Sequence, residues 1–203
     1  MPIIEKIASI DNHLFYIINQ CRIPLLDWSM PIVSDFKLFL PIIIMIISWR
    51  LWKGSKEEKI IWITGIAVAM MSDFLCAHIL KPLFNRPRPY ETLDGIFFYK
   101  HSKFILTTPE LRQTIKGTLA WPSCHAMNMW TAASFSFIYS HRLGIIVGIM
   151  ALSVCYSRIY LGMHYPMDVA GGMLFGITLG TLAALSLQGI LKSKKNNRVR
   201  NAY

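Results

Sequence analysis

The stretch from Ser157 to Asp168 places several chemically reactive side chains in one short turn between two apolar runs. Pro166 suits the first turn of a helix, where its missing N–H costs nothing, so we expect His164 in the loop and Asp168 in the first turn of the following helix. At that spacing the Asp168 carboxylate can reach one ring nitrogen of His164. Such a contact fixes the tautomer and makes the other nitrogen more nucleophilic.

Arg158 adds a cation to the same stretch. Its guanidinium carries a fork of donors that matches phosphate oxygens. The stretch therefore predicts a nucleophile, a group that orients it and an anion clamp. An ion pair and a hydrogen-bonded histidine at a membrane surface would use the same residues, and this stretch alone does not separate the two interpretations.

The composition indicates a membrane protein. Of 203 residues, 54% are hydrophobic and 16% are charged, whereas a soluble domain has about a quarter of its residues charged. The apolar residues form long blocks, which predicts an all-α, polytopic membrane helix bundle. The net charge of +10 indicates cytoplasmic basic loops and anionic ligands, not nucleic acid.

The apolar blocks predict about five transmembrane helices. They cover approximately residues 36–52, 60–80, 124–139, 143–156 and 167–191. Before them, isoleucines and leucines recur at helical spacing up to residue 20, which predicts an amphipathic helix on the membrane surface. We expect one domain over 1–203, made of this helix and a connection (1–35), a transmembrane core (36–191) and a basic cytoplasmic tail (192–203). Glycines 171, 172, 176 and 180 should allow close helix contact.

Basic residues indicate how the spans are oriented. They crowd into 50–59, 140–142 and the tail, which places those segments in the cytoplasm and the segments 81–121 and 157–166 on the outer face. The segment 81–121 nevertheless carries many cations of its own, for which an anionic substrate is one reason. These cations are Lys81, Arg86, Arg88, Lys100, Lys103, Arg112 and Lys116.

Three segments should therefore meet at one membrane interface. Lys81 and Arg88 follow the second span, Ser123 and His125 begin the third, and the stretch 157–168 joins the last two. Pro122 followed by Ser123 is typical of a helix start, with Ser123 as N-cap. A helix N-terminus offers free N–H groups and a positive dipole end to an anion. Together the segments predict a phosphate site with an acid and a base.

These motifs resemble the type 2 phosphatidic-acid phosphatase superfamily, which shares its core with the vanadium haloperoxidases. The residues from Lys81 to Pro89 match Lys, six residues, Arg-Pro, and the residues from Pro122 to His125 resemble Pro-Ser-Gly-His. Those from Ser157 to Asp168 match Ser-Arg, five residues, His, three residues, Asp. The resemblance covers about residues 60–191.

The resemblance implies a role for each matched residue. His164 would be the nucleophile that forms a phosphohistidine, Asp168 would orient it, and His125 would be the general acid. The phosphate oxygens would be held by Lys81, Arg88, Ser123, the backbone N–H of Cys124, and Arg158. No metal or other cofactor is implied.

Cysteine placement departs from the family at one position. Cys124 stands where the family usually has glycine, which would strain the backbone if a positive φ were needed; we expect a helical conformation without strain. A Cys124 thiolate nucleophile is a weaker alternative, because cysteine phosphatases have Arg six residues on and this chain has Trp130.

The cysteines 21, 76, 124 and 155 show no disulfide or metal spacing, and Cys76 and Cys155 are predicted to be packing residues.

Other polar residues carry weaker predictions. Asp73 lies in the second span and is expected to bond another helix or to act directly, and Asn128 in the third span is expected to bond a neighbouring helix. His78 should face the bundle interior. Arg86 lies in the first motif but off its pattern, where it would touch substrate or the lipid surface.

The leading hypothesis is a lipid phosphatase of the bacterial inner membrane with its site on the periplasmic side. Candidate substrates are undecaprenyl diphosphate, phosphatidylglycerol phosphate, phosphatidic acid and lipid A phosphate. A lipid phosphotransferase and a non-catalytic lipid-phosphate binder are the alternatives. Residue types do not identify the lipid or the oligomeric state.

Overall fold

The computed structural model describes residues 3–115 and 117–200. Lys116 and residues 201–203 of the predicted tail lie outside the described residues. In chain order the elements are α1 (Ile3–Gln20), α2 (Pro24–Ser34), α3 (Phe36–Lys53), α4 (Lys56–Phe74), the π-helix η1 (Leu75–Leu80), α5 (Lys81–Phe84), α6 (Pro89–Thr92), β1 (Phe97–Lys100), β2 (Lys103–Leu106), α7 (Pro109–Thr114), α8 (Cys124–Tyr139), α9 (His141–Tyr160) and α10 (Pro166–Arg200).

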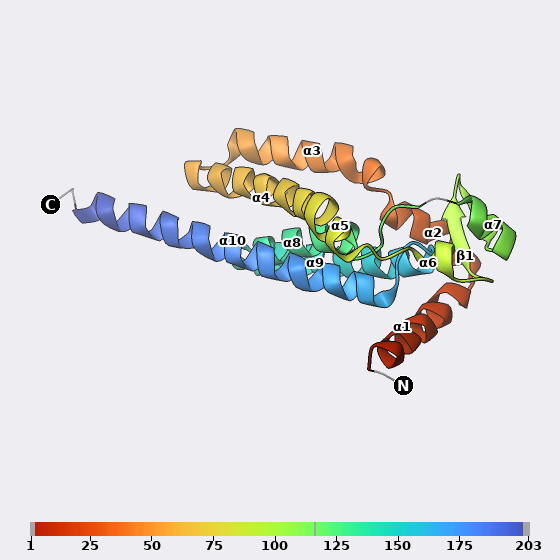
Figure 1. The fold of residues 1–203 in the computed structure, drawn as a ribbon. Coiled ribbons are helices and arrows are strands. Elements are labelled where there is room, and N and C mark those ends of the chain that lie inside the picture. The colour runs from red at the N-terminus through yellow and green to blue at the C-terminus, as the bar shows by residue number, and fades with distance from the viewer. Residues whose placement is uncertain (1–2, 116, 201–203) are drawn as a thin grey trace.

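The long helices run along one another and the short elements gather at one end of them (Figure 1). Helix α8 packs against α4, α9 and α10. Glycines of α10 make the last contact close, since a Cβ at Gly172, Gly176 or Gly180 would lie 2.4, 2.3 or 2.2 Å from an atom of α8. The predicted glycine contact is thus confirmed for these three, while Gly171 lies against the indole of Trp121.

The predicted all-α membrane bundle is confirmed. In the part of the chain that the structure describes, three helical segments are by length and composition able to cross a membrane: Lys56–Thr92, His141–Tyr160 and Pro166–Asn197. A fourth span would be formed by α2 and α3 taken together, with a 51° bend between them. Helix α8 fills the remaining predicted span with 16 residues. Helix α10 extends through most of the predicted tail instead of ending at residue 191.

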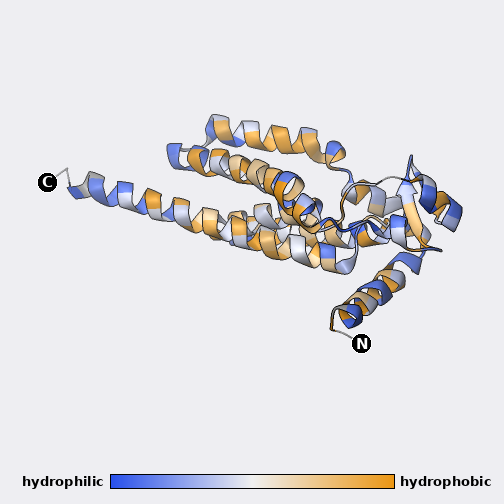
Figure 2. Cartoon of the chain, viewed as in Figure 1, coloured by the Kyte–Doolittle hydropathy of each residue, from blue (hydrophilic) through white to orange (hydrophobic). Residues whose placement is uncertain are grey.

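Helix α1 runs obliquely to the bundle (Figure 1) and has distinct faces. One face is buried in the protein through Asp11, Phe15 and Asn19, at 2%, 0% and 0% exposure. A second face exposes an apolar stripe at heptad-like spacing, visible as orange turns in Figure 2. Its members are Ile3, Ile7, Ile10, Leu14 and Ile17. This is the pattern of a helix that lies in a membrane interface and docks on a protein.

Polar side chains in the middle of the bundle bond one another. Ser72 donates to Asn128 Oδ1 at 2.8 Å, and Asn128 Nδ2 donates to Asp73 Oδ1 at 2.8 Å. Thr131 Oγ1 donates to Ser72 Oγ at 3.2 Å. The predicted helix-to-helix bonds of Asn128 and Asp73 are therefore confirmed. The expectation for His78 is wrong, because this residue is exposed and stacks on Phe74.

A two-stranded hairpin, which the sequence did not predict, covers the turn between α9 and α10. Strands β1 and β2 pair antiparallel, and Tyr99 N donates to Leu161 O at 3.0 Å. Asn19 of α1 bonds both the hairpin and α9, donating to Phe97 O at 2.7 Å and to Tyr160 O at 3.1 Å. Gly162, with a φ of +73°, lets the Phe97 carbonyl approach the turn. The hairpin and α1 together hold that turn.

Candidate functional site

His164 and Asp168 lie where the sequence predicted, in the turn after α9 and in the first turn of α10. They are 1% and 0% exposed. The distance from His164 Nδ1 to Asp168 Oδ2 is 3.6 Å, close enough for an ion pair but longer than a hydrogen bond. The same carboxylate oxygen accepts a bond from Tyr165 N at 2.8 Å. A small rotation of the imidazole would bring Nδ1 into hydrogen-bond range.

The three motifs meet at this turn. Ser123 N donates to the carbonyl of Asp168 at 2.9 Å, which joins the start of α8 to the start of α10. Arg88 Nη1 lies 3.7 Å from Met163 Sδ, which joins the first motif to the third. The structure therefore brings the segments 81–89, 122–125 and 157–168 to one end of the bundle.

The predicted phosphate-binding cations are held by neutral groups. Arg88 donates to the carbonyl and hydroxyl of Thr118 at 2.9 and 2.7 Å. Lys81 Nζ donates to Leu119 O at 2.8 Å, and Arg158 Nη1 donates to Ser34 Oγ at 2.7 Å. Within residues 3–115 and 117–200, no carboxylate forms a salt bridge with any of the three cations. Their positive charge is thus left for an anion.

The electrostatic environment keeps His164 neutral. Burial lowers the pKa of His164 well below its usual value, and the charges of Arg88, Arg158 and Lys81 lower it further, with a smaller contribution from His125. A neutral imidazole is the form that attacks an electrophile.

The start of α8 presents a hydroxyl, a backbone amide and a histidine. Ser123 is the N-cap residue, as predicted, but its side chain caps no amide. It is fully buried and its Oγ has no hydrogen-bond partner. Cys124 is the first residue of α8, and its φ is not positive. The expected unstrained conformation is therefore confirmed. His125 follows it and is exposed.

The cysteine prediction was wrong. Cys76 and Cys124 form a disulfide that links η1 to the start of α8. Spacing motifs detect cysteines that are near each other in sequence, whereas this pair is separated by 48 positions and becomes adjacent only when the helices pack. Since the Cys124 sulfur is bonded, the thiolate alternative is excluded. Cys155 is buried among apolar residues, as predicted.

Arg86 forms contacts that its predicted roles did not include. Its guanidinium donates to Asp168 Oδ1 at 2.7 Å and to Asp11 Oδ2 at 2.6 Å. Sequence reasoning did not predict the bonds of Arg86 to the two carboxylates, and it missed Asp11 as a neighbour of the site. A signal existed in α1, where Asp11, Phe15 and Asn19 repeat at helical spacing apart from the apolar stripe.

Comparisons with known proteins show that the chain is similar to membrane phosphatases in sequence and fold. A model of the PAP2 superfamily matches residues 62–191. The lipid A 4'-phosphatase of Bacteroides thetaiotaomicron is 27% identical over 85% of this chain and 75% of its own length. The undecaprenyl-diphosphatase of Sulfolobus acidocaldarius is 24% identical over 88% and 79%. A crystal structure of a transmembrane PAP2-type phosphatidylglycerolphosphate phosphatase from Bacillus subtilis has a TM-score of 0.61, with 21% identity over 93% of this chain and 87% of that one.

Proposed function

Because the chain belongs to the PAP2 superfamily and is a membrane-embedded lipid phosphatase, we propose that it cleaves its substrate through a phosphohistidine at His164. The substrate is a lipid phosphomonoester or diphosphate: undecaprenyl diphosphate, phosphatidylglycerol phosphate, phosphatidic acid or lipid A phosphate. Curated relatives named for lipid A and for undecaprenyl diphosphate support this range. The proposal treats 1–203 as one catalytic domain.

A set of buried polar atoms without hydrogen-bond partners supports the proposal most directly. Within the described residues, Ser123 Oγ and Arg158 Nε are buried and unbonded, as are Trp130 Nε1 and two arginine nitrogens outside the three motifs. Buried polar atoms in proteins nearly always have partners, so two such donors in adjoining motifs favour a ligand between them. A phosphoryl group would supply acceptor oxygens for the Ser123 hydroxyl and the Arg158 guanidinium, with its phosphorus atom facing the His164 imidazole.

The reaction would proceed in two displacements. First, His164 Nε2 attacks phosphorus, the bond to the leaving oxygen breaks, and His125 donates a proton to that oxygen. The Asp168 carboxylate accepts a hydrogen bond from His164 Nδ1–H and stabilises the positive charge that develops on the imidazole ring. Second, water attacks the phosphohistidine, His125 takes a proton from it, and the P–N bond breaks to release phosphate and restore both histidines.

Lys81, Arg88 and Arg158 would stabilise the charge on the phosphoryl oxygens. Their carbonyl and hydroxyl partners hold them in place before substrate arrives without neutralising their charge. Ser123 Oγ and the amide of Cys124 at the start of α8 add donors and the positive end of a helix dipole. Phosphoryl transfer depends mainly on such positioning and charge stabilisation.

The disulfide supports the proposed periplasmic orientation. It lies at the site end of the bundle, beside Ser123 and His125. Disulfides form and persist in oxidising compartments such as the bacterial periplasm and are rare in the cytosol. The site would then face the periplasm from the inner membrane, while the basic segments 50–59 and 140–142 would face the cytoplasm.

The test is phosphate release from a panel of these lipids by the purified protein in detergent and excess EDTA. We expect His164→Ala to lower kcat by about 10⁴-fold or more, because the nucleophile is removed. A phosphorylated intermediate should be trapped in the unaltered protein after rapid alkaline quenching, in which phosphohistidine survives, and should be missing from the variant.

The matched control is His141→Ala, which removes a histidine from the turn at the opposite end of α9. Its turnover should equal that of the unaltered protein. Near-normal turnover by a folded His164→Ala protein would refute the proposed nucleophile. Label that moves from donor lipid to acceptor lipid, and not to free phosphate, would identify a phosphotransferase instead.

A further inference from the structure

Arg86 connects two buried carboxylates that lie far apart in the sequence. It binds Asp168 at 2.7 Å and Asp11 at 2.6 Å through different guanidinium nitrogens. The guanidinium also stacks over the Tyr165 ring, 4.1 Å from its centroid. Two bonds and a stacking contact fix its orientation, so the position of Asp168 depends on where α1 holds Asp11.

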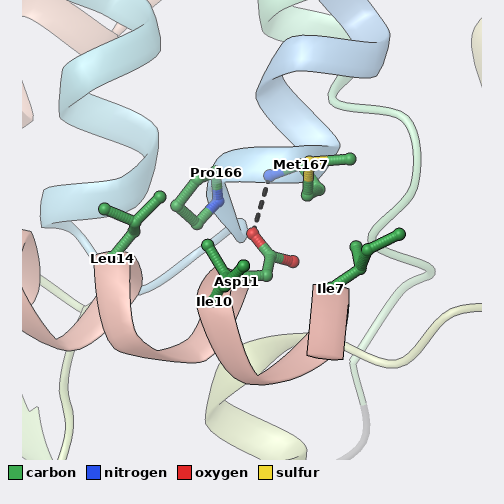
Figure 3. A pocket seen from close by; sticks show the side chains of 6 residues that line it. All are labelled: Ile7, Ile10, Asp11, Leu14, Pro166 and Met167. Carbon is green, nitrogen blue, oxygen red and sulfur yellow. Dashed lines mark hydrogen bonds between the residues drawn. The ribbon is translucent and has the colours of Figure 1, made fainter. Parts of the chain in front are cut away.

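Asp11 makes a second contact with the helix that carries Asp168. Its Oδ1 accepts a bond from Met167 N at 2.9 Å, shown as the dashed line in Figure 3. This amide belongs to the first turn of α10, where N–H groups have no partner within the helix. Asp11 therefore caps α10 from another helix. It contacts the first turn of α10 directly at the Met167 amide and indirectly through Arg86, which binds Asp168.

The hydrogen bonds to the Asp168 carboxylate fix its orientation toward His164. Oδ1 is held by Arg86, and Oδ2 is held by Tyr165 N at 2.8 Å while facing His164 Nδ1 at 3.6 Å. Without Arg86, Oδ1 would lose its charged partner and the carboxylate would be free to rotate about its Cβ–Cγ bond. The imidazole would then lose the group that fixes its tautomer.

We infer that Asp11 and Arg86 are positioning residues for the reaction, acting through Asp168 to hold His164 in its attacking orientation. The inference rests on the proposed function of His164. Neither residue touches the phosphate in this scheme, so both should affect the chemical step and leave substrate binding unchanged. Helix α1 thereby becomes part of the catalytic apparatus.

The surroundings of Asp11 connect this role to the membrane. Ile7, Ile10 and Leu14 of α1 form a groove of about 270 Å³ with Pro166 and Met167 of α10 (Figure 3). Asp11 also lines this groove. The apolar stripe and the carboxylate belong to the same two turns of helix, so displacement of α1 from the bundle would move Asp11 away from Arg86.

The experiment measures kcat, KM and Tm for Arg86→Gln, Asp11→Asn and the double variant, using the lipid that the unaltered protein turns over fastest. We expect Arg86→Gln to lower kcat by about 10- to 100-fold, as is typical when a partner that orients a reactive histidine is removed. Asp11→Asn should lower kcat by about 3- to 10-fold. KM should stay within about twofold in both, because the phosphate-binding groups are untouched.

The double variant and a conservative change separate positioning from general destabilisation. Since Asp11 acts through Arg86, the Asp11→Asn change should have little further effect on kcat in the Arg86→Gln background. Arg86→Lys keeps a cation and should restore part of the lost rate. The matched control is Arg50→Gln, which breaks an arginine–carboxylate pair with Glu58 in the segment 50–59; its kcat should be unchanged.

An unchanged kcat in folded Arg86→Gln, or a rise in KM with kcat retained, would overturn the inference. If Arg86→Gln does not fold, Asp11→Asn decides, because it changes one atom and keeps the shape of the side chain. A normal kcat for Asp11→Asn would then overturn the role of Asp11. These failures are distinct from failure of the proposed function, which is tested by His164→Ala in the same assay.

Discussion

The middle of the bundle and its site end both bury polar side chains, but they treat them differently. In the middle, Ser72, Asn128 and Thr131 bond to one another across α4 and α8. At the site end, Ser123 Oγ and Arg158 Nε are buried and have no hydrogen-bond partner within the described residues. The bonded cluster in the middle and these two donors at the site end thus differ in whether their hydrogen-bonding capacity is used, although Trp130 Nε1 of α8 is also buried and unbonded.

This difference separates structural polar groups from functional ones. A helix bundle in lipid gains from each internal hydrogen bond, because lipid tails offer no alternative partner. A buried donor left unbonded costs stability. The site end retains such donors in two of the three motifs, and the phosphate of the proposed reaction would supply their acceptors. Burial alone would not have told the two regions apart.

Among the variants that test this comparison, Ser123→Ala should have the largest effect on activity. It deletes a hydroxyl that bonds nothing in the protein, so Tm should stay constant or rise slightly. The kcat/KM should fall by about 10- to 100-fold, since a donor to the transferring phosphoryl group is lost. Phosphate-release kinetics and thermal unfolding in detergent would measure both. A drop in Tm with normal kcat/KM would mean that the hydroxyl is structural and that the contrast between the regions is false.

The second prediction concerns how the stability of the folded protein changes as the pH falls. Burial lowers the pKa of His164 well below its usual value, and the nearby cations lower it further. Between that lowered pKa and about pH 6.5, the unfolded chain therefore binds a proton that the folded protein does not. Stability is therefore complete above about pH 6.5 and decreases as the pH falls, by up to about 1.4 kcal/mol per pH unit.

Thermal unfolding at pH 7.5, 6.5 and 5.5 would check this. The unaltered protein should lose more stability on acidification than His164→Gln, which has no titrating ring at this position. Parallel curves for the two proteins would show that His164 is protonated in the folded state, contrary to a neutral nucleophile held by burial.

Thr131→Val should give the smallest change and the opposite pattern to Ser123→Ala. The substitution preserves shape and removes the bond from Thr131 to Ser72, which should cost about 1 kcal/mol of stability. The kcat should remain within about twofold, because Thr131 lies away from the three motifs. If activity falls instead while Tm is unchanged, the hydrogen bonds of the middle region serve catalysis as well.

Much of the architecture could be predicted from local sequence patterns. Apolar blocks predicted the long helices, Pro122 and Pro166 predicted where α8 and α10 begin, and the glycines of α10 predicted its close packing on α8. The site residues came from three motifs whose order along the chain placed them at one interface. Their roles stay predictions until they are tested.

The remaining features depend on contacts between distant segments. The bridge from Asp11 to Arg86 spans 75 positions, and the disulfide spans 48; no spacing rule covers either. The hairpin escaped prediction because its strands are only four residues long and lie in a polar segment. Its position depends on Asn19 and Gly162, whose partners become known only after folding.

The length of α8 has a consequence for how a lipid reaches the reaction centre. At 16 residues, this helix is about 24 Å long, shorter than the roughly 30 Å hydrocarbon thickness of a bilayer. Ser123 and His125 at its tip would then be recessed from the membrane surface. A lipid could slide in sideways with its tails still among its neighbours, so that only its phosphate leaves the leaflet and only inorganic phosphate departs into water.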